Sequence, residues 1–164
     1  MNGLLIGRFQ PFHLGHLEAV HFGLSKVDTL FIGIGSSNKS HQDRNPFTAD
    51  ERKEMITSSL DRKILERVSI YYIPDLGDHS KWTYSIDEII PNYDAVFSND
   101  DFTHELFGKR GKKIIPVELQ DRQNLSGTNI RQMIKDAKFW EDFVPDGTKN
   151  VLYMIDAKNR LQDL

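Results

Sequence analysis

Short apolar runs alternate with amphipathic segments along most of the chain, and this pattern predicts the secondary structure. Five apolar runs are predicted strands, at residues 4–6, 29–34, 68–73, 95–97 and 113–117. The run at 29–34 is apolar throughout, which is typical of a strand covered on both faces. Segments with apolar residues three and four positions apart are predicted helices, at residues 16–26, 48–60, 82–90, 102–106, 126–137 and 148–161. Strands that alternate with helices predict an α/β domain, doubly wound around a mostly parallel sheet.

Two of the predicted helices begin at recognisable capping residues. Thr48, followed three residues later by Glu51, forms a capping box, and Ser126 is a favourable N-cap. The apolar inner faces of these two helices are predicted to consist of Met55, Ile56 and Leu60 in the first, and of Ile130, Met133, Ile134 and Ala137 in the second.

The composition limits the possible functions. With 164 residues, the chain is long enough for one domain that spans residues 1–164. The net charge of −3 and the pI of about 6.1 provide no general basic field, so nucleic acid is not an expected partner. The chain has no cysteine, which excludes disulfides and thiol catalysis. It shows neither a leader sequence nor an apolar run of membrane-spanning length, so we expect a cytoplasmic protein without a membrane partner.

The stretch GRFQPFHLGH at residues 7–16 follows the first predicted strand and leads into the first predicted helix. In open α/β sheets, ligands bind beyond the carboxyl ends of the strands. Gly7 permits a sharp turn and close ligand approach, and Gly15 leaves the space between His13 and His16 open. The histidines are three residues apart, which places both imidazoles on one side of a helical turn. Arg8 adds a planar cation suited to phosphate, so the stretch favours a polyanionic ligand.

Two other interpretations of this stretch are a metal site built on the two histidines and a tight turn in which they are incidental. A metal site needs further ligands, and the remaining histidines show no ligand spacing: His21, His41, His79 and His104. The flanking strand and helix, together with Arg8, argue against an incidental turn. We therefore predict a phosphate site without a resident metal ion.

A second stretch, LSGTNIR at residues 125–131, has similar chemistry. Gly127 and Thr128 would present backbone N–H groups and a hydroxyl to an anion at a helix N-terminus. Arg131 lies one turn further and can reach the same point. Taken alone, the stretch is better explained as an ordinary capped helix. In combination with residues 7–16, it predicts a second phosphate-binding helix start.

Two loops follow predicted strands and should lie at the same edge of the sheet. The long polar loop at residues 35–47 contains Arg44, and it is either a solvated connector or a binding loop. In the loop at residues 75–81, Asp75 or Asp78 would contact a substrate, or both are turn residues. Trp82 begins the next predicted helix, where it either packs in the core or faces a cationic ring.

The stretches at residues 7–16 and 125–131 resemble the two signatures of the nucleotidylyltransferase superfamily, in the expected order. The form GRFQPFH and the loop SSNKSHQDRNPFTADER at residues 36–52 resemble the archaeal-type nicotinamide mononucleotide (NMN) adenylyltransferases. The resemblance covers about residues 1–142. It implies a Rossmann-like nucleotidylyltransferase fold and transfer of the adenylyl group of ATP to NMN, giving NAD and pyrophosphate. It also implies Mg²⁺ bound with the ATP, and it suggests a homo-oligomer such as a hexamer.

The resemblance also implies roles for individual residues. The residues expected to neutralise the phosphates and the developing pyrophosphate are His13, His16, Arg8, Arg44 and Arg131. The expected ATP contacts are Gly7, Arg8, Phe9, His13, Gly15, His16, Ser126, Gly127, Thr128 and Arg131. The expected NMN contacts are Phe9, Gln10, Ser36, Ser37, Asp75 and Trp82, with Trp82 stacked on the nicotinamide ring.

One segment departs from the family pattern. Relatives are expected to carry a sequence similar to SGNP where this chain has SNDD, at residues 98–101. A carboxylate at Asp100 would repel phosphates, so we expect it to contact a ribose hydroxyl, if it contacts ATP at all. Two other functions stay open at this point. The acceptor could be another phosphate, such as FMN or phosphopantetheine, or the chain could be a nucleotide-binding sensor without turnover.

Overall fold

The computed structural model describes residues 1–77, 81–117 and 125–164. Five strands form one sheet in the order β3-β2-β1-β4-β5, and every pair of neighbouring strands is parallel. The strands are β1 (Asn2–Gly7), β2 (Thr29–Ile34), β3 (Val68–Tyr72), β4 (Ala95–Phe97) and β5 (Lys113–Ile115). The predicted α/β class with a mostly parallel sheet is confirmed.

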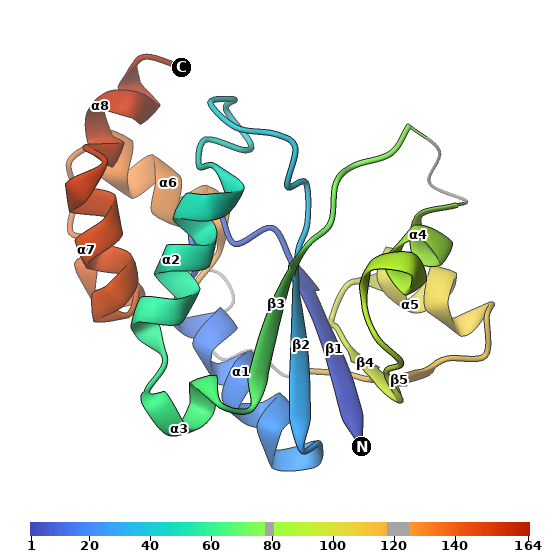
Figure 1. Ribbon diagram of the computed structural model, residues 1–164. Coiled ribbons are helices and arrows are strands. Elements are labelled where there is room, and N and C mark those ends of the chain that lie inside the picture. Colours follow the sequence, from blue (N-terminus) through green and yellow to red (C-terminus); the bar gives the residue numbers. More distant parts are fainter. Residues whose placement is uncertain (78–80, 118–124) are drawn as a thin grey trace.

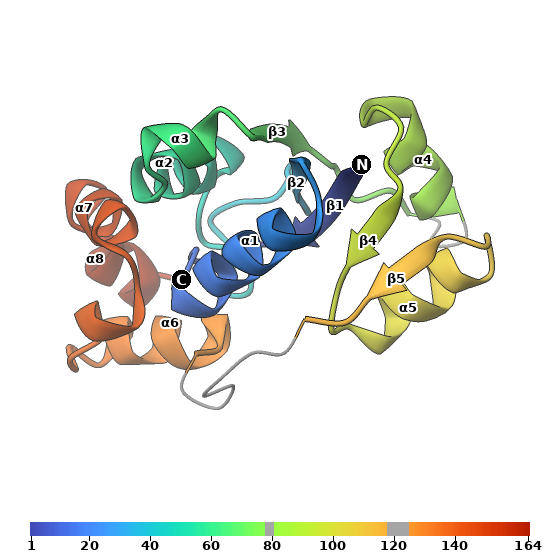
Figure 2. The ribbon, with the colours of Figure 1, turned by 90° about the horizontal axis from the view of Figure 1, so that it is seen from below.

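Helices cover both faces of the sheet, as Figures 1 and 2 show. On one side lie α1 (Leu14–Lys26), α2 (Ala49–Ser59), α3 (Arg62–Leu65), α6 (Gly127–Lys135), α7 (Asp146–Met154) and α8 (Ala157–Gln162). On the other side lie α4 (Trp82–Ile89) and α5 (Asp101–Gly108). A short 3₁₀ helix, η2 (Glu141–Phe143), precedes α7. None of the helices in the described ranges is long and apolar enough to cross a membrane.

The two faces of the sheet form two separate hydrophobic cores, because successive side chains of a strand point to opposite faces. Leu5 belongs to the larger core with residues of α1, α2, α6, α7 and α8. Its neighbour Leu4 is fully buried in the smaller core, together with Ile86 of α4 and Phe107 of α5. The inner faces predicted for the helices that start at Thr48 and Ser126 are buried, except that Met133 is half-buried and Ala137 is exposed.

The chain reverses its direction of travel across the sheet next to β1. It runs outward from β1 to β2 and β3, and then returns to place β4 and β5 on the other side of β1. At such a switch point the loops after the two central strands diverge and leave a crevice at the carboxyl edge of the sheet. The loops after β1 and β4 therefore define where a ligand should bind.

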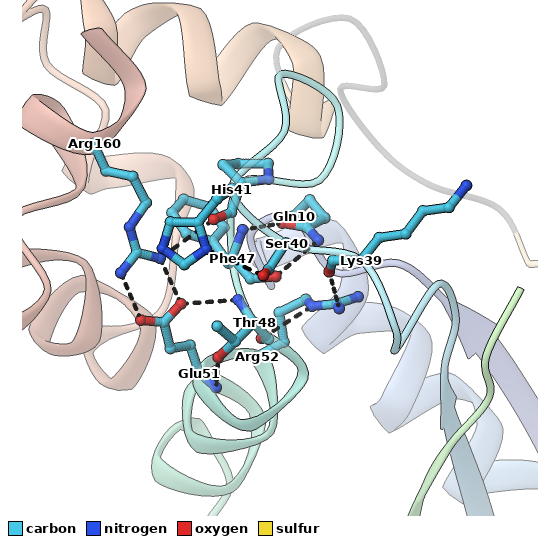
Figure 3. Close-up of polar contacts among 10 residues, drawn as sticks. Gln10, Lys39, Ser40, His41, Phe47, Thr48, Glu51, Arg52 and Arg160 are labelled. Carbon is cyan, nitrogen blue, oxygen red and sulfur yellow. Dashed lines mark hydrogen bonds and ion pairs between the residues drawn. The ribbon is translucent and has the colours of Figure 1, made fainter. Parts of the chain in front are cut away.

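The C-terminal region differs from the single helix predicted at residues 148–161. The chain forms α7 and α8, which are separated at Ile155 and Asp156, where Asp156 has a left-handed φ of 53°. A second left-handed residue, Ala137 with φ of 56°, ends α6 and explains why Ala137 does not join its buried face. Helix α8 is fastened to the start of α2, because Arg160 binds both carboxylate oxygens of Glu51 at 2.6 and 2.9 Å (Figure 3).

Candidate active site

Three adjoining cavities lie at the carboxyl edge of the sheet. The inner cavity, of about 380 Å³, lies between the start of α1 and the β4–α5 turn, and residues such as Gly15, His16, Ser98 and Asp100 line it. The middle cavity, of about 360 Å³, shares Ser98 and Asp100 with the inner one and extends to Trp82.

The outer cavity, of about 440 Å³, continues from the middle one, with which it shares Arg8, Ser36 and Asp75, and it reaches Arg44. The shared lining residues make the three cavities one continuous cleft at the switch point of the sheet.

His13 and His16 cap the first turn of α1. The Nδ1 atom of His13 accepts a hydrogen bond from the backbone N–H of Gly15 at 3.1 Å, and Nδ1 of His16 accepts one from the N–H of His13 at 3.2 Å. The two rings stack with their centroids 3.7 Å apart. Because each Nδ1 atom accepts a hydrogen bond, a neutral ring must carry its proton on Nε2.

Both histidines are neutral at physiological pH. Burial lowers the pKa of His13 to about 4. Burial, followed by the charge of His13, lowers the pKa of His16 well below its ordinary value. In the free protein these side chains therefore add no positive charge at neutral pH and offer two neutral Nε2–H donors, and their role toward bound phosphates stays a prediction. The described residues contain no group of three or more His, Cys, Asp or Glu side chains that could hold a metal ion.

Three arginines from different loops and helices lie near one another at this edge of the sheet: Arg8 lines the middle and outer cavities, Arg44 lines the outer one, and Arg131 lines a small separate cavity of about 80 Å³. Burial lowers the pKa of Arg8, and the charge of Arg44 lowers it further. The pKa of Arg131 is lowered by burial and then by Arg8, with a smaller contribution from Arg44. Arg131 is held in place by donating to the backbone carbonyl of Gln10 at 2.8 Å. Three cations that repel one another in the free protein form a site that an anion would stabilise.

The stretch at residues 125–131 meets the first stretch at the Gln10 carbonyl. Ser126 caps α6 by accepting a hydrogen bond from the N–H of Asn129 at 3.0 Å, as predicted. A Cβ atom at Gly127 would lie 3.0 Å from the carbonyl oxygen of Gln10, so glycine allows α6 to approach the 7–16 turn. The hydroxyl of Thr128 accepts a hydrogen bond from Arg131 at 3.4 Å. The fold thus brings together the two stretches that are far apart in the sequence.

Two predicted nucleotide contacts are buried instead. The side chain of Phe9 is 1% exposed, and its ring stands edge-on to His16 with the centroids 4.8 Å apart. The side chain of Gln10 is 3% exposed, and its amide pairs with the backbone N–H and C=O of Phe47 (Figure 3). These side chains lie beneath the turn, so a substrate could contact these two residues only through their backbone groups, and the expected contacts stay a prediction. Ser37 is half-buried, and its N–H donates to the carbonyl of Ile73.

Asp75 connects the loops after β2 and β3. Its carboxylate accepts a hydrogen bond from the hydroxyl of Ser36 at 2.9 Å and pairs with Lys39 at 3.0 Å. Burial opposes the ionisation of Asp75, but the hydrogen bonds from Lys39 and Ser36 outweigh it and hold the pKa below its ordinary value. Asp75 therefore lines the cleft as a carboxylate, whereas Asp78 lies outside the described residues.

Trp82 and Asp100 both line the middle cavity, and each also has a structural contact of its own. Trp82 is half-buried at the start of α4, lines this cavity and packs edge-on against Phe107, so the core and cleft interpretations both describe its position. Asp100 lines the inner and middle cavities but also caps α5, because its Oδ2 atom accepts from both the N–H and the hydroxyl of Thr103 at 2.8 and 2.7 Å.

Arg52 of α2 is a residue that the sequence analysis did not single out. Its side chain is fully buried, and it donates hydrogen bonds to backbone carbonyls of the loops that carry Arg8 and Ser36. The available signal was its place at the end of the loop sequence at residues 36–52, where an arginine follows the capping-box glutamate.

A parallel sheet of this order, with two helix N-termini and three arginines around one cleft, is the architecture of a nucleotidylyltransferase. Residues 4–133 match the cytidylyltransferase-like family model, and the chain belongs to that family. It is 37% identical over 169 residues to the nicotinamide-nucleotide adenylyltransferase of Archaeoglobus fulgidus, an alignment that covers 100% of this chain and 97% of the relative. It is 39% identical to the enzyme of the same name from Thermoplasma acidophilum, over 99% of this chain and 91% of the relative. The chain therefore belongs to the archaeal-type nicotinamide-nucleotide adenylyltransferases.

Solved structures support the fold. A crystal structure of a bifunctional NMN adenylyltransferase/ADP ribose pyrophosphatase from Francisella tularensis matches 99% of this chain with a TM-score of 0.83 and 23% sequence identity. The matched region is 52% of that protein, so this chain spans about half of its length. Another crystal structure described by the same name, in complex with AMP and a Mn ion, matches with a TM-score of 0.77.

Proposed function

We propose that the chain transfers the adenylyl group of ATP to nicotinamide mononucleotide, giving NAD and pyrophosphate. Similarity over essentially the whole length to enzymes of this name supports the assignment. The structural observation that carries it is the group formed by the neutral His13–His16 pair, Arg8 and Arg131 at the switch point, which opens onto a continuous cleft. In this proposal the inner and middle cavities would each take one of the two nucleotides.

The reaction is a displacement at phosphorus. An oxygen of the NMN 5′-phosphate forms a bond to the α-phosphorus of ATP, the bond from this phosphorus to the bridging oxygen of the β-phosphate breaks, and pyrophosphate leaves with both electrons of that bond. The second pKa of a phosphate monoester is about 6, so the nucleophile is ionised at neutral pH and needs no general base. Neutral histidines suit this chemistry, because they stabilise charge by donating hydrogen bonds and need not accept a proton.

ATP would occupy the inner cavity, with its triphosphate between the starts of α1 and α6. There the Nε2–H groups of His13 and His16 would face the phosphates, and Arg8 and Arg131 would neutralise them. Arg44 lines the outer cavity and would meet the departing pyrophosphate. The protein's contribution is to hold two anions close together and to offset the charge that develops as pyrophosphate departs.

NMN would occupy the middle cavity, where Trp82, Asp75 and Ser36 are lining residues. The positively charged nicotinamide ring would lie against the indole of Trp82, which favours a cation through its π face. The carboxylate of Asp75 adds negative charge at the same end of the cavity.

Mg²⁺ is expected to bind together with ATP as part of the substrate. The described residues offer no group of three or more side chains that could hold the ion, so the phosphates and water would provide most of its ligands. When bound, the ion supplies additional neutralisation of phosphate charge. The assembly into a homo-oligomer and the cytoplasmic location remain predictions from the sequence.

Pyrophosphate release from ATP in the presence of different acceptors tests the proposed function. With NMN, we expect NAD and pyrophosphate to form in equal amounts, both quantified by ³¹P NMR spectroscopy. Equal turnover with FMN or phosphopantetheine would overturn the choice of acceptor. Binding of ATP without pyrophosphate release for any of the three acceptors would instead identify a nucleotide sensor.

A further inference from the structure

Arg52 is a fully buried cation whose hydrogen bonds, within the part of the chain that the structure describes, all go to backbone carbonyl groups. Its side chain is 0% exposed, and of the ion pairs found among the described residues none involves it. Its guanidinium donates to five carbonyl oxygens, those of Thr48 at 3.1 Å, Arg8 at 2.9 Å, Gly35 at 2.7 Å, Ser36 at 3.1 Å and Lys39 at 3.4 Å (Figure 3 shows the contacts with Thr48 and Lys39). A guanidinium has five N–H groups, so its hydrogen-bonding capacity is fully used.

Two of these carbonyls precede residues with unusual backbone conformations. The Nη1 atom of Arg52 binds the carbonyl of Arg8, which comes before Phe9, and that of Gly35, which comes before Ser36. Phe9 has φ of 53° and Ser36 has φ of 49°, in the left-handed region that non-glycine residues rarely adopt. Such conformations persist only where surrounding contacts determine them. One nitrogen atom therefore orients the peptide group that precedes each of the two left-handed residues.

The positions of these residues connect Arg52 to the cleft. Arg8 and Ser36 both line the middle and outer cavities, and the hydroxyl of Ser36 binds Asp75. Because the C=O and N–H of a trans peptide point in opposite directions, carbonyls drawn onto Arg52 turn the N–H groups of Phe9 and Ser36 away from the guanidinium. Arg52 thus lies behind the loops whose front surface forms the cleft.

We propose that Arg52 is a positioning residue for adenylyl transfer. Through Nη1 it holds the 8–9 and 35–36 peptides in the orientation that aims Arg8 and the Ser36–Asp75 pair at the substrates. The inference rests on the proposed function, and it adds a residue that touches neither substrate nor the reacting atoms. Burial lowers the pKa of Arg52 to about 10, so it remains a cation at neutral pH and its charge adds to the field behind the phosphate site.

Arginine is required at this position because of its geometry. Lysine keeps the positive charge but has three N–H donors on one nitrogen, so it cannot reach five carbonyls that surround a planar group. Arg52→Lys therefore separates the charge from the positioning. A control for the loss of guanidinium–carbonyl hydrogen bonds is Arg67, an exposed arginine whose hydrogen bonds among the described residues go to the backbone carbonyls of Leu24, Val27 and Asp28, near the amino end of β2.

The test compares Arg52→Lys with Arg67→Lys in steady-state NAD formation, with folding checked by circular dichroism. We expect kcat of Arg52→Lys to fall about 100-fold, the loss that a misplacement of about 1 Å can cause. Because surface substitutions away from functional features usually change little, Arg67→Lys should retain kcat within about twofold. An unchanged kcat in a folded Arg52→Lys protein, or an equal loss in both variants, would overturn the proposal.

A double-mutant cycle with Arg8→Ala separates positioning from a general loss of stability. If Arg52 acts through Arg8, the effect of Arg52→Lys on kcat should shrink to a few-fold or less when Arg8 is already alanine, since coupled residues are non-additive. Independent, fully additive effects on kcat would contradict the mechanism.

The wild-type protein provides a measurement that needs neither activity nor a folded variant. The Nε–H proton of Arg52, assigned by NOEs to Thr48, should exchange slowly with solvent both before and after ATP is added, because the loops are held in advance. Fast exchange in the free protein, or protection that develops only with ATP, would contradict preorganisation. A wild-type protein that makes no NAD would refute the proposed function and leave this measurement unaffected.

Discussion

Replacement of His16 by alanine tests whether a neutral imidazole stabilises the transferring phosphate. The change removes the acceptor for the N–H of His13, the ring stack on His13 at 3.7 Å and the edge contact with Phe9 at 4.8 Å. A lost cap costs about 1 kcal/mol, and each aromatic contact contributes about 0.5–1.5 kcal/mol. The total of roughly 2–4 kcal/mol should lower Tm by about 4–16 °C for a chain of this size. The variant should still fold, because native domains are stable by about 5–15 kcal/mol.

The catalytic effect of His16→Ala should exceed its effect on binding. Loss of a donor aimed at developing charge costs about 10²–10³ in kcat. A hydrogen bond to bound ATP is worth about 0.5–1.5 kcal/mol net, so Kd for ATP should rise about tenfold or less. Steady-state kinetics and calorimetric titration with ATP measure the two quantities. A near-normal kcat in the folded variant would refute the role of His16.

The pH dependence distinguishes a neutral donor from a cation. Since the pKa of the NMN phosphate is about 6, kcat of the wild type should rise with pH through about 6. It should then stay level to about pH 8, because both histidines are already neutral and lose no proton in that range. A decline in kcat above about pH 6.5 would show that a protonated imidazole takes part.

The free energy of unfolding should also depend on pH, through the titration of His13. The pKa of His13 is lowered to about 4 in the folded state, so between its unfolded value of about 6.5 and about 4 the unfolded chain binds more protons. The stabilising contribution of the neutral ring is therefore present above about pH 6.5 and is lost as the pH falls through this window. Thermal unfolding at several pH values should show that Tm decreases as the pH is lowered from about 6.5 to about 4, and that it decreases less steeply in His13→Ala.

Four further substitutions test the assignments around the cleft. Arg44→Ala and Arg131→Ala should weaken ATP binding or slow turnover by about 10-fold or more while circular dichroism stays unchanged; loss of the fold with ATP affinity intact would make the residue a structural partner. Trp82→Ala should raise KM for NMN about tenfold and leave KM for ATP nearly unchanged, since a desolvated cation–π contact is worth about 1–2 kcal/mol; an unchanged KM for NMN would restrict Trp82 to the core. Asp100→Asn keeps a cap acceptor for α5 and removes a charge beside the phosphates, so KM for ATP should fall a few-fold at nearly constant Tm; a raised KM would show that the carboxylate itself binds ATP.

Local patterns predicted the order of the elements because each one depends on neighbouring residues. The apolar run of β2 and the capping box at Thr48 and Glu51 are properties of short segments, and the structure confirms both. The break between α7 and α8 was missed, because Asp156 adopts a left-handed φ without a glycine or proline to mark it. Ala137 at the end of α6 was assigned to the buried face for the same reason.

The sequence predicted which residues lie near the candidate site. It did not predict how their side chains are oriented, buried or protonated. The motif at residues 7–16 identifies which side chains are near the cleft, but Phe9 and Gln10 point into the core because left-handed backbone and distant partners such as Phe47 orient them. The neutral state of His13 depends on burial by the completed fold. The sequence did not identify Arg52 as a functional candidate, because four of its five acceptors are carbonyl groups of residues that are distant in the sequence and approach it only in the folded chain.

A crystal structure with NMN and a non-hydrolysable ATP analogue tests the central claim most directly. We expect the triphosphate to lie within hydrogen-bonding distance, about 2.7–3.2 Å, of Nε2 of His16 and of the guanidinium groups of Arg8 and Arg131. The nicotinamide ring should lie against Trp82, with the NMN phosphate facing the α-phosphorus. Phosphates bound away from this cluster, or a nicotinamide ring outside the middle cavity, would contradict the account.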